Sequence, residues 1–99
     1  MVRQKIIEIV LGAISASNIG RLQQAHLEVS PTAPLFGAPS PLESLGLVAL
    51  LIDIEEAFAR EGHDIALSDE RALSERRSPF RDVPSLVNYI ERLLAGRDP

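Results

Sequence analysis

The chain has 99 residues and a net charge of -4, enough for one domain with a modest core. This acidity disfavours binding to nucleic-acid phosphates and favours partners with basic surfaces. The absence of cysteine excludes disulfides, thiolate metal sites and cysteine nucleophiles. His26 and His63 each stand alone, without further ligands at metal-binding spacing, so we expect no metal site.

The first predicted helix covers residues 2–17. Its apolar residues recur at three- and four-residue spacing, as on one buried helix face: Ile6, Val10, Ala13 and Ile14. Arg3 and Lys5 before this apolar stretch also resemble the start of a signal peptide, but Glu8 interrupts the stretch. No segment reaches the roughly 20 apolar residues of a membrane span. We therefore expect a cytoplasmic protein.

A long connection follows, over residues 18–42. Four prolines prevent a continuous helix there: Pro31, Pro34, Pro39 and Pro41. A short helical turn over residues 21–27 is compatible with the sequence. A connection of this length in a small domain is often functional. It can also serve as a strap between antiparallel helices, with Leu35 and Phe36 pinning it to the core, and the sequence leaves both roles open.

Residues 43–60 form the strongest predicted helix, and Gly62 ends it. The start of this helix is ambiguous. Ser40-Pro41-Leu42-Glu43 has the form of a capping box, and with Ser40 as the cap, Ser44 would lie in the first full turn. Eight of the ten residues from Leu45 to Ile54 are apolar, which is more than one buried stripe requires.

Two sides of this helix are therefore apolar. One side is expected to face the core: Leu47, Leu50, Leu51, Ile54 and Phe58. Val48, Ala49 and Ile52 would then face outward, in line with Ser44, as an exposed strip for docking a partner. Alternatively, the helix is buried on both sides, for instance by the long connection. Periodicity alone does not decide between the two.

The rest of the chain is a polar segment, residues 61–81, and a last helix. The polar segment is compatible with a short helix over residues 69–75. It also contains a basic cluster, which belongs either to a solvated loop or to a contact for a specialised partner: Arg71, Arg76, Arg77 and Arg81. Asp82 is predicted to cap the last helix, with Pro84 in its first turn and Gly96 at its end. The apolar face of this helix comprises Val83, Leu86, Val87, Ile90, Leu93 and Leu94. The sequence thus predicts a single all-α domain over residues 1–99, a bundle of three or four helices.

Residues 35–58 and 82–94 resemble acyl carrier proteins. In that family an Asp-Ser-Leu motif opens the second helix, and the serine hydroxyl receives 4'-phosphopantetheine. Glu43-Ser44-Leu45 matches this motif with Glu in place of Asp. Glu55 and Glu56 match the family's acidic helix end, and Phe58 matches its closing aromatic residue. The last helix, with Val87-Asn88-Tyr89-Ile90, is similar to the family's last helix.

The resemblance implies a carrier of acyl-carrier-protein type, with phosphopantetheine attached to Ser44 between Glu43 and Leu45. It also implies a docking face on the second helix: Val48, Ala49, Ile52, Glu55 and Glu56. The implied partners are a phosphopantetheinyl transferase and the enzymes that load or use acyl or aminoacyl thioesters. We expect the carrier itself to be a monomer and to catalyse nothing.

The residues that follow Ser44 indicate the kind of pathway, and two other classes of function remain open. Gly46 and Ala49 stand where fatty-acid carriers tend to have acidic residues, which favours a specialised lipid or secondary-metabolite pathway. The main alternative is a carrier-like adaptor in which Ser44 is unmodified and the apolar strip is the whole function. An enzyme is the third class, and it is disfavoured because the sequence offers no nucleophile-base pair or metal cluster.

Overall fold

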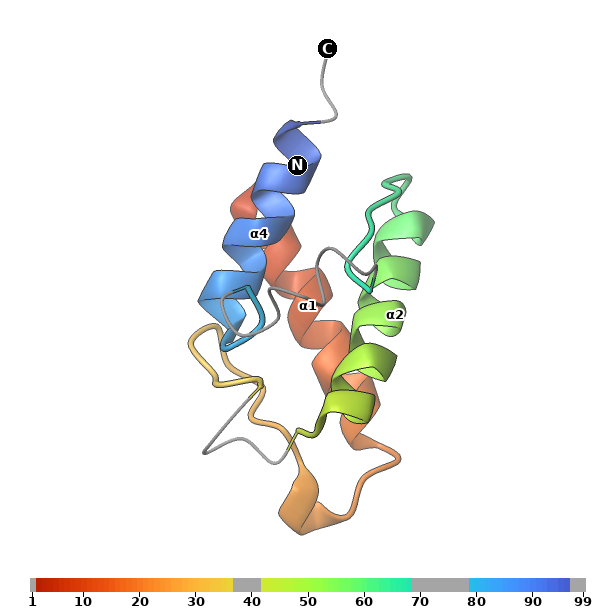
Figure 1. Ribbon diagram of the computed structural model, residues 1–99, viewed down its shortest axis with the longest axis vertical. Helices are drawn as coiled ribbons and strands as arrows, with labels where there is room; N and C mark the ends of the chain where they lie inside the picture. The colour runs from red at the N-terminus through yellow and green to blue at the C-terminus, as the bar shows by residue number, and fades with distance from the viewer. Residues whose placement is uncertain (1, 37–41, 69–78, 97–99) are drawn as a thin grey trace.

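Three α-helices and one short 3-10 helix make up the described part of the computed structural model, which covers residues 2–36, 42–68 and 79–96 (Figure 1). In chain order they are α1 (Arg3–Asn18), η1 (Gln23–Ala25), α2 (Ser44–Arg60) and α4 (Val83–Ala95). Within those ranges, extended pairing is limited to two isolated bridges, Pro34 with Asp82 and Phe36 with Leu42. The prediction of a small helical bundle is confirmed.

The helix α1 packs against both α2 and α4. Figure 1 shows that α1 runs in the opposite direction to the other two helices, with the connection into α2 at the far end of the bundle from the N-terminus. Ser44, as the first residue of α2, therefore lies at the end of the bundle where α1 finishes. Among the described helices, none combines the length and apolarity that a bilayer crossing requires.

The core is aliphatic and is closed by two phenylalanines, Phe58 and Phe80. The five residues of α2 that were predicted to face the core are all buried: Leu47, Leu50, Leu51, Ile54 and Phe58. The predicted faces of the other two helices are confirmed as well, by Ile6, Val10 and Ile14 on α1 and by Val83, Leu86, Val87 and Ile90 on α4. Ala13, Leu93 and Leu94, also predicted to face the core, pack half-buried at its edge.

The long connection packs against the core as a strap between the helices, which is one of its two predicted roles. Leu35 is buried and Phe36 is half-buried against the core. The backbone N–H of Leu35 donates to the carbonyl of Arg81 at 2.9 Å, and that of Phe36 donates to the carbonyl of Phe80 at 3.1 Å. The η1 turn falls inside residues 21–27, where a short helical turn was compatible with the sequence.

The start of α2 settles the sequence ambiguity. Glu43 is the residue before the helix and is extended, with φ -95° and ψ 168°, and Leu42 pairs with Phe36 in an isolated bridge. A helix capped by Ser40 would need both Leu42 and Glu43 to be helical, so that alternative is wrong. Ser40 itself lies outside the described residues.

Local signals mark the end of α2 and the start of α4. Gly62, with φ 85°, donates its N–H to the carbonyl of Ala59 at 3.0 Å and so closes α2. Asp82 caps α4 as predicted, since its Oδ1 accepts the N–H of Ser85 at 2.8 Å. The predicted short helix over residues 69–75 and three of the clustered arginines, Arg71, Arg76 and Arg77, lie outside the described residues.

Candidate functional site

Ser44 is the first residue of α2 and lies at the end of the bundle where α1 finishes (Figure 1). The N–H of Leu47 donates to the carbonyl of Glu43 at 2.8 Å, which is the first bond of the helix. The N–H groups before Leu47 have no acceptor within the helix, and Glu43 makes no side-chain cap bond to them. Both neighbours of Ser44 are open to solvent: Glu43 is exposed, and Leu45 exposes 84% of its surface.

An apolar strip runs along the outward side of α2, starting at Leu45. Ala49 is exposed, and Ile52 exposes 41% of its surface. Spacings of four and three residues place Leu45, Ala49 and Ile52 on one line of the helix. We call the strip and its two exposed acidic neighbours the outer face of α2: Leu45, Ala49, Ile52, Asp53 and Glu56.

Compared with the predicted strip, the outer face is rotated slightly about the helix axis. Ala49 and Ile52 are exposed as predicted, whereas Val48 is half-buried at the margin. Leu45, assigned from the sequence only as a neighbour of the attachment serine, is the most exposed large apolar residue of α2 among those that the structure describes. Glu56 is exposed as expected of a docking residue.

The carboxylate of Glu55 accepts hydrogen bonds from the segment that follows α2. Its carboxylate accepts the backbone N–H of Leu67 at 2.5 Å and that of Ser68 at 2.8 Å. The hydroxyl of Ser68 also donates to it at 3.1 Å. Glu55 thereby holds the segment after α2 against the helix, and a partner would have to displace these bonds to use its charge. The structure therefore gives Glu55 a role that its predicted place in the docking face did not include.

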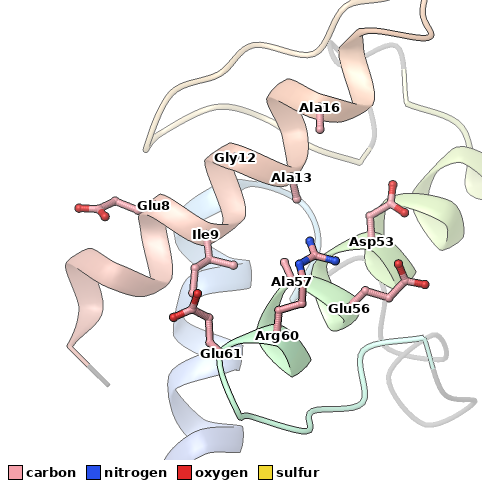
Figure 2. A pocket seen from close by; sticks show the side chains of 10 residues that line it. All are labelled: Glu8, Ile9, Gly12, Ala13, Ala16, Asp53, Glu56, Ala57, Arg60 and Glu61. Carbon is pink, nitrogen blue, oxygen red and sulfur yellow. The ribbon is translucent and has the colours of Figure 1, made fainter.

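A groove with a volume of about 460 Å³ lies between α1 and α2 (Figure 2). Small residues line part of it, at Gly12, Ala13, Ala16 and Ala57, and four carboxylates lie around it, from Glu8, Asp53, Glu56 and Glu61. Figure 2 shows the Arg60 side chain extending between the two helices toward α1. The groove runs beside the second half of α2, away from Ser44, and shares Asp53 and Glu56 with the outer face. Arg60 is the one cation among the described residues of this lining, and Lys5 pairs with one of the four carboxylates, that of Glu61, at 3.8 Å, so the groove keeps a net negative charge.

Arg21 reaches the first turn of α2 from the end of α1. Its Nε donates to the hydroxyl of Ser17 at 3.3 Å. Its Nη2 lies 3.3 Å from the position that a Cβ on Gly46 would occupy, and the Cδ1 of Leu42 lies 3.1 Å from the same position. Sequence reasoning did not single out Arg21, because no local pattern links it to a helix that begins 23 residues later (44 - 21).

The polar residues of the last-helix motif hold helices together. Asn88 accepts a hydrogen bond from Arg3 at 2.8 Å, and Arg3 also pairs with Glu91. The ring of Tyr89 meets that of Phe80 edge-on, with centroids 6.0 Å apart. These residues therefore tie α1 and the segment before α4 to α4.

The described residues contain no group of three or more His, Cys, Asp or Glu side chains placed to hold a metal ion. No protein-family model matches the chain, and it matches no curated protein and no solved structure. The start of α2, its outer face and the acidic groove are therefore the features from which a function can be inferred.

Proposed function

We propose that the chain is an acyl carrier protein that holds its cargo on a 4'-phosphopantetheine arm attached to Ser44. The observation that carries this proposal is the coincidence of Ser44 with the start of α2, directly before the outward apolar strip that begins at Leu45. The modification requires a modifying enzyme to reach the start of α2, and the neighbours of Ser44 in the chain, Glu43 and Leu45, are both exposed. The sequence resemblance around Glu43-Ser44-Leu45 supports the same assignment.

The residues around Ser44 fit the attachment chemistry. In the modification, Ser44 Oγ bonds to the phosphorus next to pantetheine in coenzyme A. The pyrophosphate bond breaks, adenosine 3',5'-bisphosphate leaves, and the transferase accepts the hydroxyl proton. The N–H groups of the first helical turn favour the resulting anion. When bound, the arm supplies the thiol that forms the cargo thioester, and the chain itself has no cysteine.

The outer face of α2 is the proposed docking surface for the partner enzymes. Its strip offers apolar contacts beside Ser44, and Asp53 and Glu56 offer negative charge at its far part. Partners with basic patches would be attracted to it and to the adjoining groove. The carrier would act by raising the effective concentration of a tethered acyl or aminoacyl group at those enzymes. We place it in a specialised lipid or secondary-metabolite pathway.

Mass spectrometry tests this function directly. Incubation with coenzyme A and a broad-specificity phosphopantetheinyl transferase should add one phosphopantetheine to the intact chain. Ser44→Ala should abolish the addition, whereas Ser15→Ala, which alters an exposed serine of α1, should leave it unchanged. Peptide mapping should find the group on Ser44. Labelling of Ser40 instead would contradict the assignment of Ser44 as the attachment residue.

One observation favours a second candidate, an adaptor that binds a partner protein without modification. Neither Ser44 nor its neighbours Glu43 and Leu45 line the groove between α1 and α2, so the groove could bind a basic partner whether or not the serine is modified. Failure of several transferases to label any serine would favour the adaptor over the carrier.

A further inference from the structure

Small side chains form part of the lining of the groove between α1 and α2. Gly12 and Ala16 lie four residues apart and therefore fall on one line of α1, and Ala57 lines the groove from α2 (Figure 2). A Cβ added to Gly12 would meet no atom within 4 Å. The space beside this line of α1 is therefore open, and side chains of another molecule can enter it.

Most carboxylates of the groove lack a paired cation. Lys5 pairs with Glu61 at 3.8 Å. The other three carboxylates belong to exposed residues, and none of them has a lysine or arginine at ion-pair distance among the residues that the structure describes: Glu8, Asp53 and Glu56. A concave surface that carries charges of one sign attracts and orients partners of the opposite sign.

The side chain of Arg60 already occupies part of this groove. It extends from α2 between the two helices toward α1 (Figure 2), and it is exposed. Within the described ranges Arg60 forms no ion pair, so its guanidinium is free to move away. The groove therefore accommodates a guanidinium, and a cation from a partner would compete with Arg60 for the same negative field.

The shape of the groove favours a protein segment over a small molecule. Most of the residues that line it are exposed, including Gly12, Ala16 and Arg60. A site for a small molecule encloses most of the ligand's surface. An amphipathic helix instead lays one face into a groove and leaves its other face in solvent. The open lining therefore fits a helix better than a small cation.

We propose that this groove is a second docking surface of the chain and that its occupant is a basic amphipathic helix of a partner protein. Apolar side chains of the helix fill the open space beside Gly12, and its lysines or arginines reach the unpaired carboxylates and displace Arg60. The inference goes beyond the proposed carrier function, because Ser44 does not line the groove. The unmodified and the modified chain should therefore bind the helix equally well.

Calorimetric titration with a synthetic peptide tests this docking surface. The probe is a peptide of about 18 residues, long enough to form a helix, with leucines on one face and lysines on the other. Gly12→Leu fills the open space and should weaken binding about tenfold. Glu56→Gln should weaken it about threefold, as expected for one exposed ion pair, and high salt should reduce the affinity further. Thermal melts check that Gly12→Leu is folded.

Arg60→Gln gives a prediction of the opposite sign. It removes the internal competitor and a repulsive charge, so it should strengthen binding of the peptide about threefold. A loss of folding cannot produce such a gain. Glu28→Gln and Arg81→Gln are the matched controls, because both residues are exposed and neither lines the groove. Both variants, and Ser44→Ala, should bind the peptide like the unsubstituted chain.

Several outcomes would overturn the inference. One is unchanged binding by a folded Gly12→Leu variant, and another is binding by Arg60→Gln that is not tighter than that of the unsubstituted chain. Equal weakening by Glu28→Gln and Glu56→Gln would show attraction to the overall charge alone. Spermidine binding as tightly as the peptide, with the same sensitivity to Gly12→Leu, would make the occupant a small cation.

The carrier function is measured separately, by labelling of Ser44. A chain that is labelled but does not bind the peptide keeps the carrier function and overturns the docking groove. A chain that is not labelled but binds the peptide through Gly12 and Glu56 supports the docking groove and overturns the carrier function.

Discussion

The carboxylate of Glu55 binds Ser68 through both the backbone N–H, at 2.8 Å, and the hydroxyl, at 3.1 Å. This contact joins the middle of α2 to the segment that follows it, where Ile65 and Leu67 are buried. A carboxylate that accepts backbone N–H groups makes charge-assisted bonds, which are stronger than bonds between neutral groups. Glu55 therefore contributes to the fold as well as lying next to the proposed docking face.

Glu55→Ala should lower the free energy of unfolding by about 1–3 kcal/mol, because it leaves the N–H groups of Leu67 and Ser68 without their charged acceptor. Glu56→Ala is the matched control on an exposed position, with an expected change within about 0.5 kcal/mol. Urea denaturation of the two variants measures the difference. Equal stability would mean that the contact with Ser68 contributes nothing to folding.

Alanine substitution at Gly62 and at Gly12 should change the stability of the protein in opposite directions. Gly62 has φ 85°, a conformation that strains a residue with a Cβ, so Gly62→Ala should destabilise the protein by about 1 kcal/mol. Gly12 lies within α1, and a Cβ there would meet nothing within 4 Å. Gly12→Ala should therefore stabilise the protein by about 0.5–1 kcal/mol through helix propensity. Thermal melts of both variants check the signs, and a stabilising Gly62→Ala would contradict the backbone assignment.

The cap of α4 gives a third prediction. Asp82→Ala removes the acceptor of the Ser85 N–H, 2.8 Å away, and should cost about 1 kcal/mol. Asp82→Asn keeps a capping oxygen but removes the charge that faces Arg81 at 3.6 Å. Because an exposed ion pair contributes little, Asp82→Asn should be nearly as stable as the unsubstituted chain. If the two variants are equally unstable in urea, the charge matters more than the cap.

The sequence predicts much of this fold because the signals for it are local. Asp82 and Pro84 specify the start of α4, and Gly62 specifies the end of α2. The false capping box at Ser40 shows the limit of such signals. Its last two residues, Leu42 and Glu43, are extended, and Leu42 is buried while pairing with Phe36 from the long connection. A tertiary contact that no local pattern encodes therefore overrides the local motif.

The candidate site was less predictable than the fold for two physical reasons. When most residues of a helix are apolar, periodicity fixes its rotation poorly, and the exposed strip begins at Leu45 with Val48 at its margin instead of in its centre. The approach of Arg21 to Gly46 depends on how a proline-rich connection folds, which the residues themselves do not reveal. Ser44 is a candidate site residue only because Glu43-Ser44-Leu45 resembles a family motif.

The last prediction separates docking from packing on α2. Leu45 and Ile52 lie on the outer face, whereas Leu51 is fully buried. Leu45→Glu and Ile52→Glu should change the free energy of unfolding by no more than about 1 kcal/mol, because each carboxylate can reach water. Both should weaken recognition by the transferase, since each puts a charge where an apolar contact is proposed. Leu51→Glu should unfold the domain, because it forces a carboxylate into an apolar core.

Thermal melts measure the stability of each variant, and a labelling assay at limiting transferase measures its recognition by the transferase. A raised KM for labelling in Leu45→Glu with an unchanged Tm would place Leu45 in the partner's footprint. Ala59→Glu, exposed near the far end of α2, is the matched control for added charge and should leave KM unchanged. If Ile52→Glu melts as severely as Leu51→Glu, the strip belongs to the core. If Leu45→Glu and Ile52→Glu are both stable and label normally, the outer face is not the transferase's docking surface, and the acidic groove beside α1 becomes the next surface to mutate.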